Sequence, residues 1–338
     1  MTILENISLK NLNTFGLEAK ARYFVETISE EELKEAISYD LFKHASKLVL
    51  GGGSNILLTA DFDGLVIKIS IPGIKIIEED KDAVFIEAGA GVVWNYLVHF
   101  CVERNFGGIE NLSLIPGTVG AAPIQNIGAY GQELKDVLYL LKGISISEVK
   151  EKTFQNDECK FDYRDSIFKN ELKGKFIVTS IILRLSRNPK LNLSYGSVKD
   201  EIEKLNLKQI TVRDVSNVIS NIRRRKLPDP AVTGNAGSYF RNPEVDEIKF
   251  LKIKEDFPDV IAHKQVNGNY KIAAGWMIEK CGWKGKRIGN TGSHAKQSLV
   301  IVNYGGAEGK EILMLAGKIK NSVKQKFDIV LTEEVNIY

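Results

Sequence analysis

The segment Ser113–Gly131 constrains the fold more than any other part of the chain. It reads SLIPGTVGAAPIQNIGAYG, with glycines at 117, 120, 128 and 131 and alanines between them. Small side chains let a ligand touch the backbone, and consecutive N–H groups in tight turns bind anions. A glycine-rich surface loop has the same composition. The hydrogen-bonding side chains Gln125, Asn126 and Tyr130 favour a binding segment, because flexibility alone does not require them.

A second glycine-rich turn, Gly51–Asn55, reads GGGSN and follows the expected strand Lys47–Leu50. This place after a strand suits a phosphate-binding loop, although GGGSN by itself is compatible with any turn. Neither segment is a GxGxxG entering a helix, and GxxxxGK[ST] does not occur. The pattern therefore argues against the common dinucleotide fold and the P-loop, and indicates a different nucleotide fold.

Periodic apolar positions predict the main helices and strands. The expected helices are Glu30–Phe42, Trp94–Val102, a helix opened by the capping box Thr211–Asp214, and Glu308–Phe327. The expected strands are Leu65–Ile69, Ile74–Ile77, Val84–Glu87, Phe176–Leu185 and Asp328–Tyr338. The helix after Thr211 must end before Pro228, which is a candidate domain boundary. The elements alternate without a steady βαβ rhythm, so the sequence predicts an α+β fold.

Composition excludes several functional classes. A length of 338 residues predicts two or three domains, and a net charge of +3 demands no basic face for nucleic acid. The three cysteines form no CxxC pair and the four histidines show no HxH or HxxxH spacing, so no disulfide or metal is expected. Because there is no signal peptide and no apolar run of about 18–20 residues, we expect a cytoplasmic protein that does not enter a membrane.

Six motifs in order resemble the UDP-N-acetylenolpyruvoylglucosamine reductase family. They are LGGGSN, SLIPGTVGAAPIQNIGAYG, FDYRDSIF, KLPDP…GNAGSYFRNP, AAGWMIE and LTEEV, and the resemblance runs from about Asn13 to Val335. It implies a two-part FAD-binding fold of the vanillyl-alcohol-oxidase type and an α+β substrate-binding domain. The implied division is 1–70 with 323–338, then 71–213, then 214–322 for substrate. Tyr195 in LSYGS is similar to the tyrosine of the subgroup that carries an extra loop.

The resemblance also implies the reaction and its ligands. NADPH reduces noncovalent FAD, which reduces UDP-N-acetylglucosamine enolpyruvate to UDP-N-acetylmuramate for peptidoglycan. We expect a monomer. The residues expected to hold FAD, chiefly its pyrophosphate, are Gly51, Gly52, Gly53, Ser54, Asn55, Pro116, Gly117, Thr118, Gly120, Ala121, Ala122, Asn126, Gly128, Ala129 and Tyr130. Those expected to contact the nucleotide sugar are Tyr195, Arg223, Lys226, Asn242, Lys284 and Gln297. The basic run 223–226 is also typical of a solvated helix face.

Three residues resemble the catalytic groups of that family. Hydride addition leaves an enolate beside the pyruvyl carboxylate, which a fixed cation and a neutral acid would stabilise. Arg164 and Glu334 look like these two groups, and Ser238 looks like the serine that protonates the enolate carbon, with Lys226 as a possible proton relay. Each has an ordinary alternative: an ion pair of Arg164 with Asp162 or Asp165, a surface glutamate, and a Gly-Ser turn. Alternation places Glu333 and Glu334 on opposite faces, so only one can point inward.

Two other functions fit the glycine-rich segments. Another flavin oxidoreductase of the same fold, such as an oxidase of sugar lactones or alcohols, would keep both segments without the three catalytic residues. A non-catalytic nucleotide-binding module would keep the segments alone. The reaction depends on Arg164, Ser238 and Glu334, which the glycines do not specify.

Overall fold

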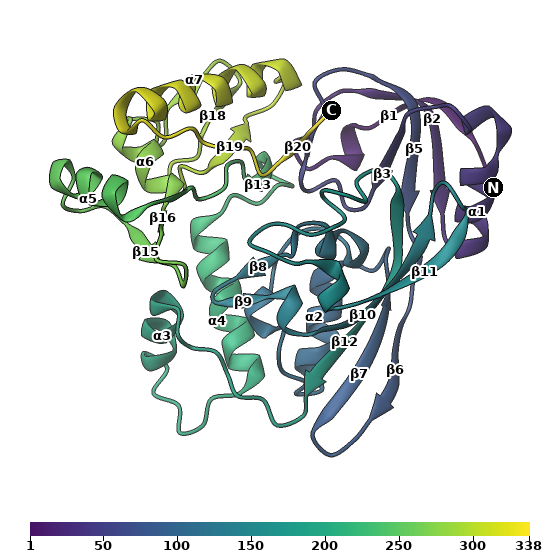
Figure 1. Cartoon of the computed structure of the whole chain (residues 1–338), viewed down its shortest axis with the longest axis horizontal. Helices are drawn as coiled ribbons and strands as arrows, with labels where there is room; N and C mark the ends of the chain where they lie inside the picture. The colour runs from purple at the N-terminus through teal and green to yellow at the C-terminus, as the bar shows by residue number, and fades with distance from the viewer. The chain divides into compact units, whose positions relative to one another are not determined.

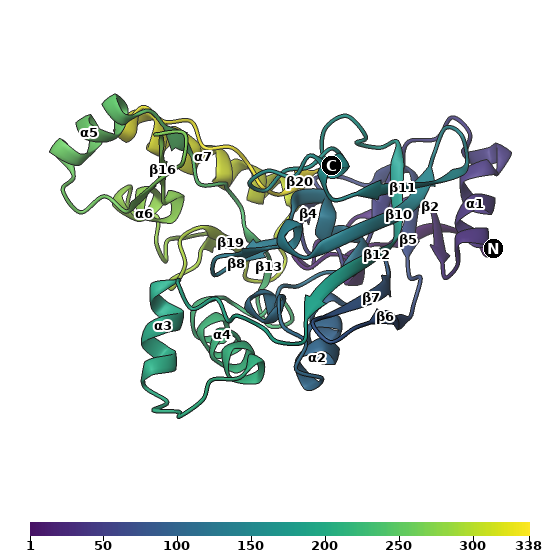
Figure 2. The same ribbon diagram turned by 60° about the horizontal axis from the view of Figure 1, so that its bottom comes forward.

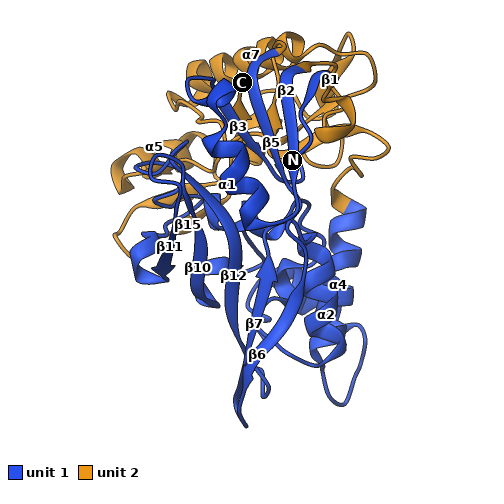
Figure 3. Cartoon of the chain, turned by 90° about the vertical axis from the view of Figure 1, so that its right-hand side faces the viewer, with its two compact units in different colours: residues 1–7, 21–53, 62–225 blue, residues 8–20, 54–61, 226–338 orange.

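The computed structural model describes residues 1–338, which form two compact units (Figure 3). Unit 1 contains Met1–Ile7, Ala21–Gly53 and Phe62–Arg225, and unit 2 contains Ser8–Lys20, Ser54–Asp61 and Lys226–Tyr338. The chain is α+β, as expected. No helix is long and apolar enough to cross a membrane.

The first sheet of unit 1 has four strands in the order β1-β2-β5-β3. Its strands are β1 (Leu4–Ser8), β2 (Lys20–Thr27), β5 (Phe62–Ile69) and β3 (Lys47–Leu50). β5 runs parallel to both β2 and β3. Helix α1 (Glu30–Ser38) begins at Ser29, whose hydroxyl accepts the N–H of Glu32, and buries Leu33, Ala36 and Ile37. The expected helix Glu30–Phe42 is therefore too long, because Tyr39 is extended and a separate 3₁₀ turn covers Asp40–Phe42.

The second sheet of unit 1 has five strands in the order β11-β10-β12-β7-β6, with antiparallel neighbours (Figure 1). Its strands are β6 (Ile74–Glu79), β7 (Ala83–Gly89), β10 (Leu138–Ser145), β11 (Lys150–Gln155) and β12 (Phe176–Ser186). The central strand β12 is the apolar strand expected from Phe176–Leu185. Helix α2 (Trp94–Glu103) packs its predicted stripe into the same core, and the indole N–H of Trp94 donates to Leu112 O at 3.0 Å.

Two helices complete unit 1 and lie side by side in both views (Figures 1 and 2). They are α3 (Gly196–Glu203) and α4 (Val212–Lys226), and their apolar faces share one small core around Val198, Val215 and Ile219. The capping box is confirmed, because Thr211 N donates to Asp214 Oδ2 at 2.9 Å and Asp214 N donates to Thr211 Oγ1 at 3.2 Å. A short ribbon, β8 (Gly128–Ala129) with β9 (Gln132–Glu133), shapes the end of the glycine-rich segment.

Unit 2 is built from short strands and three helices around its own core. One sheet has the order β13-β19-β18-β17, with β13 (Gly234–Ser238), β19 (Val300–Asn303), β18 (Thr291–Ser293) and β17 (Arg287–Ile288). A second has β14 (Glu244–Val245), β16 (Tyr270–Ile272) and β15 (Ala262–Lys264). The helices are α5 (Glu247–Asp256), α6 (Ala274–Lys280) and α7 (Gly309–Phe327).

The C-terminal segment departs from its expected structure. The strand predicted over Asp328–Tyr338 is wrong, since only β20 (Asn336–Ile337) pairs, in parallel with β4 (Ile56–Leu57). Asp328 takes a left-handed conformation (φ 52°) at the end of α7, and Phe240 and Glu333 form an isolated bridge. Without a continuous ladder, simple alternation does not determine where Glu333 and Glu334 point.

Candidate functional site

Gly51 and Gly52 pack directly against the segment Pro116–Ala122 in unit 1. A Cβ on Gly51 would lie 2.5 Å from Thr118 Oγ1, and one on Gly52 would lie 2.9 Å from Gly117 Cα. Only glycine permits backbones to approach this closely. Two loops separated by more than sixty residues in the sequence therefore meet backbone to backbone.

Thr118 Oγ1 is buried in this surface and has no hydrogen-bond partner. A buried hydroxyl without a partner is unfavourable, so it calls for a ligand atom that can share its hydrogen. A side chain does not fit at Gly120 either, because an added Cβ would lie 2.6 Å from Ala90 Cβ. The close glycines and the unpartnered hydroxyl together fit a phosphate group.

The end of the segment is held in an unusual backbone conformation. Asn126 (φ 43°) and Tyr130 (φ 51°) are both left-handed, which costs free energy for residues other than glycine. Side-chain amides stabilise this shape: Asn126 Nδ2 donates to Glu133 Oε2 at 2.9 Å, and Asn111 Nδ2 donates to Tyr130 O at 2.9 Å. The expected binding segment is thus held in place by hydrogen bonds to residues just outside it.

Two arginines lie at this end of the segment. Arg164, also left-handed (φ 53°), donates from Nη2 to Gly128 O at 2.7 Å. Arg223 on α4 lies beside the Tyr130 hydroxyl, and its Nε is buried without a hydrogen-bond partner. Burial lowers the pKa of Arg223, and the nearby charge of Arg164 acts in the same direction while Tyr130 opposes it. Two neighbouring cations with a buried unpaired N–H form a site for an anion.

The Tyr195 loop is tied to the same place. The rings of Tyr130 and Tyr195 meet edge to face at 5.3 Å, and Tyr195 is 47% exposed. Asn111 Nδ2, which bonds Tyr130 O, also donates to Asn192 O at 2.9 Å. Asn111 was not among the residues expected from the sequence. Its side chain is buried and joins the glycine-rich segment to the loop, a role that only the fold reveals.

Unit 2 places Ser238 and Glu334 on adjoining backbone segments. Glu334 N donates to Tyr239 O at 2.8 Å, and Glu334 is 8% exposed. Ser238 ends β13 just after a register shift, where Gly237 is left-handed (φ 71°). Glu333 is bound elsewhere, because its carboxylate accepts Lys320 Nζ at 2.7 Å. Of the two glutamates, Glu334 is the buried one.

The other predicted residues of unit 2 lie in varied surroundings. Asn55 Nδ2 donates to Glu334 O at 3.3 Å, which links the GGGSN turn to the C-terminal segment. Asn242 Oδ1 accepts Ala274 N at 3.0 Å, an arrangement that fixes its side chain. Lys284 is paired with Glu279 at 2.8 Å on the surface, Gln297 is half-buried beside Gly275, and Lys226 is exposed at the end of α4.

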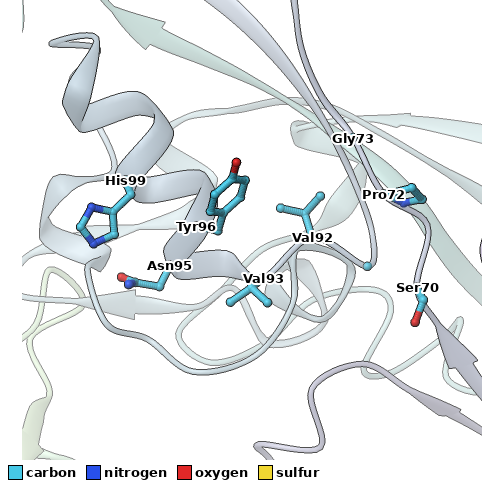
Figure 4. A pocket seen from close by; sticks show the side chains of 9 residues that line it. Ser70, Pro72, Gly73, Val92, Val93, Asn95, Tyr96 and His99 are labelled. Atoms are coloured by element: carbon cyan, nitrogen blue, oxygen red, sulfur yellow. The ribbon is translucent and has the colours of Figure 1, made fainter.

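A cavity of about 560 Å³ in unit 1 adjoins the glycine-rich segment and was not expected from the sequence. Figure 4 shows Val92 and Val93 beside Tyr96 and His99 of α2 along its wall. The lining residue Val92 is hydrogen-bonded to the glycine-rich segment, because Val119 N donates to Val92 O at 2.8 Å. Two residues further on, Trp94 N donates to Gly117 O at 3.0 Å. The lining is Ser70, Pro72, Gly73, Gly91, Val92, Val93, Asn95, Tyr96 and His99.

Comparison with known proteins gives consistent matches. Residues 21–142 match an FAD binding domain, and residues 229–338 match the C-terminal domain of UDP-N-acetylenolpyruvoylglucosamine reductase. The chain is 48% identical over 338 residues to the protein of that name from Flavobacterium johnsoniae, covering 100% of both. It is 45% identical to that of Pseudomonas aeruginosa, covering 100% of this chain and 99% of that protein.

A solved structure shares the fold. The UDP-N-acetylenolpyruvylglucosamine reductase of Thermus caldophilus matches with a TM-score of 0.70 and 23% identity, covering 100% of this chain and 98% of that one. At 23% identity this match shows that the two chains share a fold. The chemistry must be argued from the residues of the site.

Proposed function

This chain belongs to the UDP-N-acetylenolpyruvoylglucosamine reductase family, and we propose that it reduces UDP-N-acetylglucosamine enolpyruvate to UDP-N-acetylmuramate with NADPH as electron donor. It is a flavin-dependent oxidoreductase with FAD as its cofactor. The single observation that carries the proposed substrate is the pair Arg164 and Arg223 beside Tyr130, next to the glycine-rich segment. A substrate with one carboxylate and one diphosphate supplies the anions that such a pair requires.

The glycine contacts in unit 1 fit the FAD pyrophosphate. Gly51–Gly53, Gly117 and Thr118 would hold it by backbone N–H groups, and the unpartnered hydroxyl of Thr118 would donate to a phosphate oxygen. Pro116, Gly120, Ala121 and Ala122 would line the same place, where the N–H groups of Gly120 and Ala121 already donate to Ala90 O and Thr118 O. Asn126, Gly128, Ala129 and Tyr130 extend the binding surface in unit 1. Ser54 and Asn55, which follow Gly53 directly in the sequence, are also proposed to bind FAD. When bound, the flavin supplies a hydride to the terminal carbon of the enolpyruvyl group.

Arg164 binds the carboxylate of the enolpyruvyl group in this proposal. Negative charge grows on that carboxylate during the reaction, so a permanently charged guanidinium stabilises the transition state more than the ground state. The Gly128 carbonyl holds the Arg164 side chain in place before substrate arrives. The residues proposed to contact the nucleotide sugar are Tyr195, Arg223, Lys226, Asn242, Lys284 and Gln297.

Ser238 is the proposed proton donor and Glu334 the proposed partner of the enolate. The bulge before Ser238 sets its side chain apart from the regular ladder of β13 and β19, as bulges beside active sites do. Glu334 is 8% exposed, and the proposed role requires its carboxyl group to be protonated or to share a proton when it supports the enolate. Because serine is a weak acid, Lys226 is proposed to relay protons to Ser238.

A comparison of the two half-reactions tests these roles. Ser238→Ala should leave NADPH reduction of the flavin nearly intact and slow reoxidation by the enolpyruvyl substrate by at least about a hundredfold, the usual contribution of a general acid. Both steps can be followed separately by anaerobic stopped-flow absorption. Equal losses in the two steps would show that Ser238 supports the structure and does not donate the proton.

The finer organisation is part of the same proposal. We propose the three-part division 1–70 with 323–338, 71–213 and 214–322, with the last part binding substrate. The family models at 21–142 and 229–338 support a cofactor half and a substrate half. A monomer acting in the cytoplasm is the proposed working form, and sedimentation at micromolar concentration checks its oligomeric state.

A further inference from the structure

Lys68 interrupts the buried part of strand β5, which runs from Gly64 to Ile69. In β5 the residues Leu65, Val66, Ile67 and Ile69 are each at most 4% exposed, whereas Lys68 is half-buried. In the parallel register Lys68 lies opposite Leu50, the last residue of β3 and the one before Gly51. The sheet therefore carries the lysine side chain to the start of the GGGSN turn.

The Lys68 ammonium has an unusual partner. Nζ donates to the carbonyl oxygen of Gly51 at 2.6 Å, and the side chain forms no ion pair. Burial lowers the pKa of Lys68, an effect that Glu26 opposes, and the Glu26 carboxylate itself accepts the Ser70 hydroxyl at 2.5 Å. Glu26 lies opposite Lys68 in the β2–β5 register but forms no ion pair with it, so the half-buried ammonium would still be stabilised by a further anion nearby.

The proposed FAD pyrophosphate would lie next to Gly51, the residue whose carbonyl oxygen Lys68 binds. Gly51 packs on the buried hydroxyl of Thr118, which lacks a partner. We propose that Lys68 is a further FAD-binding residue: its ammonium holds the Gly51 carbonyl away from the pyrophosphate and supplies positive charge to it. This inference rests on the pyrophosphate position proposed above. A carbonyl pointing at a phosphate would repel it, so fixing that carbonyl and adding a charge act together.

Lys47 provides a matched control. It is also half-buried, its Nζ donates to the carbonyls of Phe42 (2.5 Å) and Ala45 (3.3 Å), and burial lowers its pKa as well. It stands at the opposite end of β3 from Gly51. Lys47→Met thus removes a lysine of the same kind from the same sheet without touching the turn.

The experiment is FAD binding to the apoprotein, measured by flavin fluorescence. Lys68→Met should raise the FAD Kd at least about tenfold in 0.1 M salt, because it removes one positive charge beside a doubly charged pyrophosphate near a protein surface. Tenfold corresponds to about 1.4 kcal/mol. Lys68→Arg should bind like the wild type, and Lys47→Met should be unchanged. The difference between Lys68→Met and wild type should shrink in 1 M salt, where charges are screened.

The possible results separate the two proposals. A Kd for Lys68→Met within twofold of wild type overturns the role of Lys68, and so does an equal loss in Lys47→Met. If the wild-type apoprotein binds no FAD, the proposed cofactor site fails and Lys68 with it. Should Lys68→Met not fold, Lys68→Gln decides, because glutamine keeps a donor for Gly51 without the charge and should still bind about tenfold more weakly than Lys68→Arg.

Discussion

Gly52→Ala should weaken FAD binding by forcing two backbone segments apart. The new Cβ would lie 2.9 Å from Gly117 Cα and 3.3 Å from Gly117 C, and no rotation of a side chain can relieve a contact with backbone. Carbon atoms in contact are about 3.5–4.0 Å apart, so the segments must separate by roughly 0.7 Å. A backbone N–H bonded to phosphate at about 2.9 Å would then be near 3.6 Å, outside hydrogen-bonding range.

Losing one charge-assisted hydrogen bond costs about 1.5–3 kcal/mol, so the FAD Kd should rise by roughly 10- to 100-fold. Fluorescence titration of the apoprotein measures this change. Gly317→Ala in α7 is the control, because nothing lies within 4 Å of its added Cβ, and alanine should raise stability by about 1 kcal/mol without affecting FAD. A Gly52→Ala protein that binds FAD within threefold of wild type would refute the proposed contact of these segments with the pyrophosphate.

Two further predictions concern the buried carboxyl group of Glu110 and the half-buried ion pair of Lys320 with Glu333. Burial raises the pKa of Glu110 above its ordinary 4.5, so its contribution to stability is fully present below pH 4.5 and lost as pH rises through the raised pKa. Glu110→Gln should accordingly gain stability over wild type in urea unfolding at pH 8, with the gain vanishing at pH 4; a gap independent of pH would contradict this. Lys320→Met should lower the free energy of unfolding by about 1–2 kcal/mol, because it leaves the half-buried Glu333 carboxylate without its ion-pair partner. This value lies between those typical of exposed and of buried ion pairs. Unaltered urea unfolding would argue against any stabilising role for the pair.

Features that depend on neighbouring residues could be predicted from the sequence. The stripe of α2, the capping box at Thr211 and the apolar strand β12 each follow from local periodicity or from hydrogen bonds between residues three apart. The prediction that the glycine-rich segments bind an anion likewise rests on local composition, namely small residues in tight turns. Their closeness to one another was implied only by family resemblance, and the contact of Gly52 with Gly117 now accounts for it physically.

Features that depend on distant pairing could not be predicted. Asn111 joins Tyr130 to Asn192, a residue 81 positions away, and nothing local to Asn111 signals that bond. The prediction of a continuous strand over Asp328–Tyr338 was wrong, because this segment pairs in only two short places. Glu333 forms a single bridge with Phe240, and Asn336–Ile337 pair with the two residues of β4. For Lys68 a signal did exist, namely a charge within an apolar strand, but its meaning depends on the parallel register with β3.

The most direct test is the reoxidation of the reduced enzyme by its proposed substrate. Purified protein carrying FAD is reduced without oxygen by NADPH, mixed with UDP-N-acetylglucosamine enolpyruvate, and followed by the return of oxidised flavin absorption. The proposed function predicts rapid reoxidation with formation of one UDP-N-acetylmuramate per flavin. Flavin that stays reduced in the presence of this substrate would contradict it.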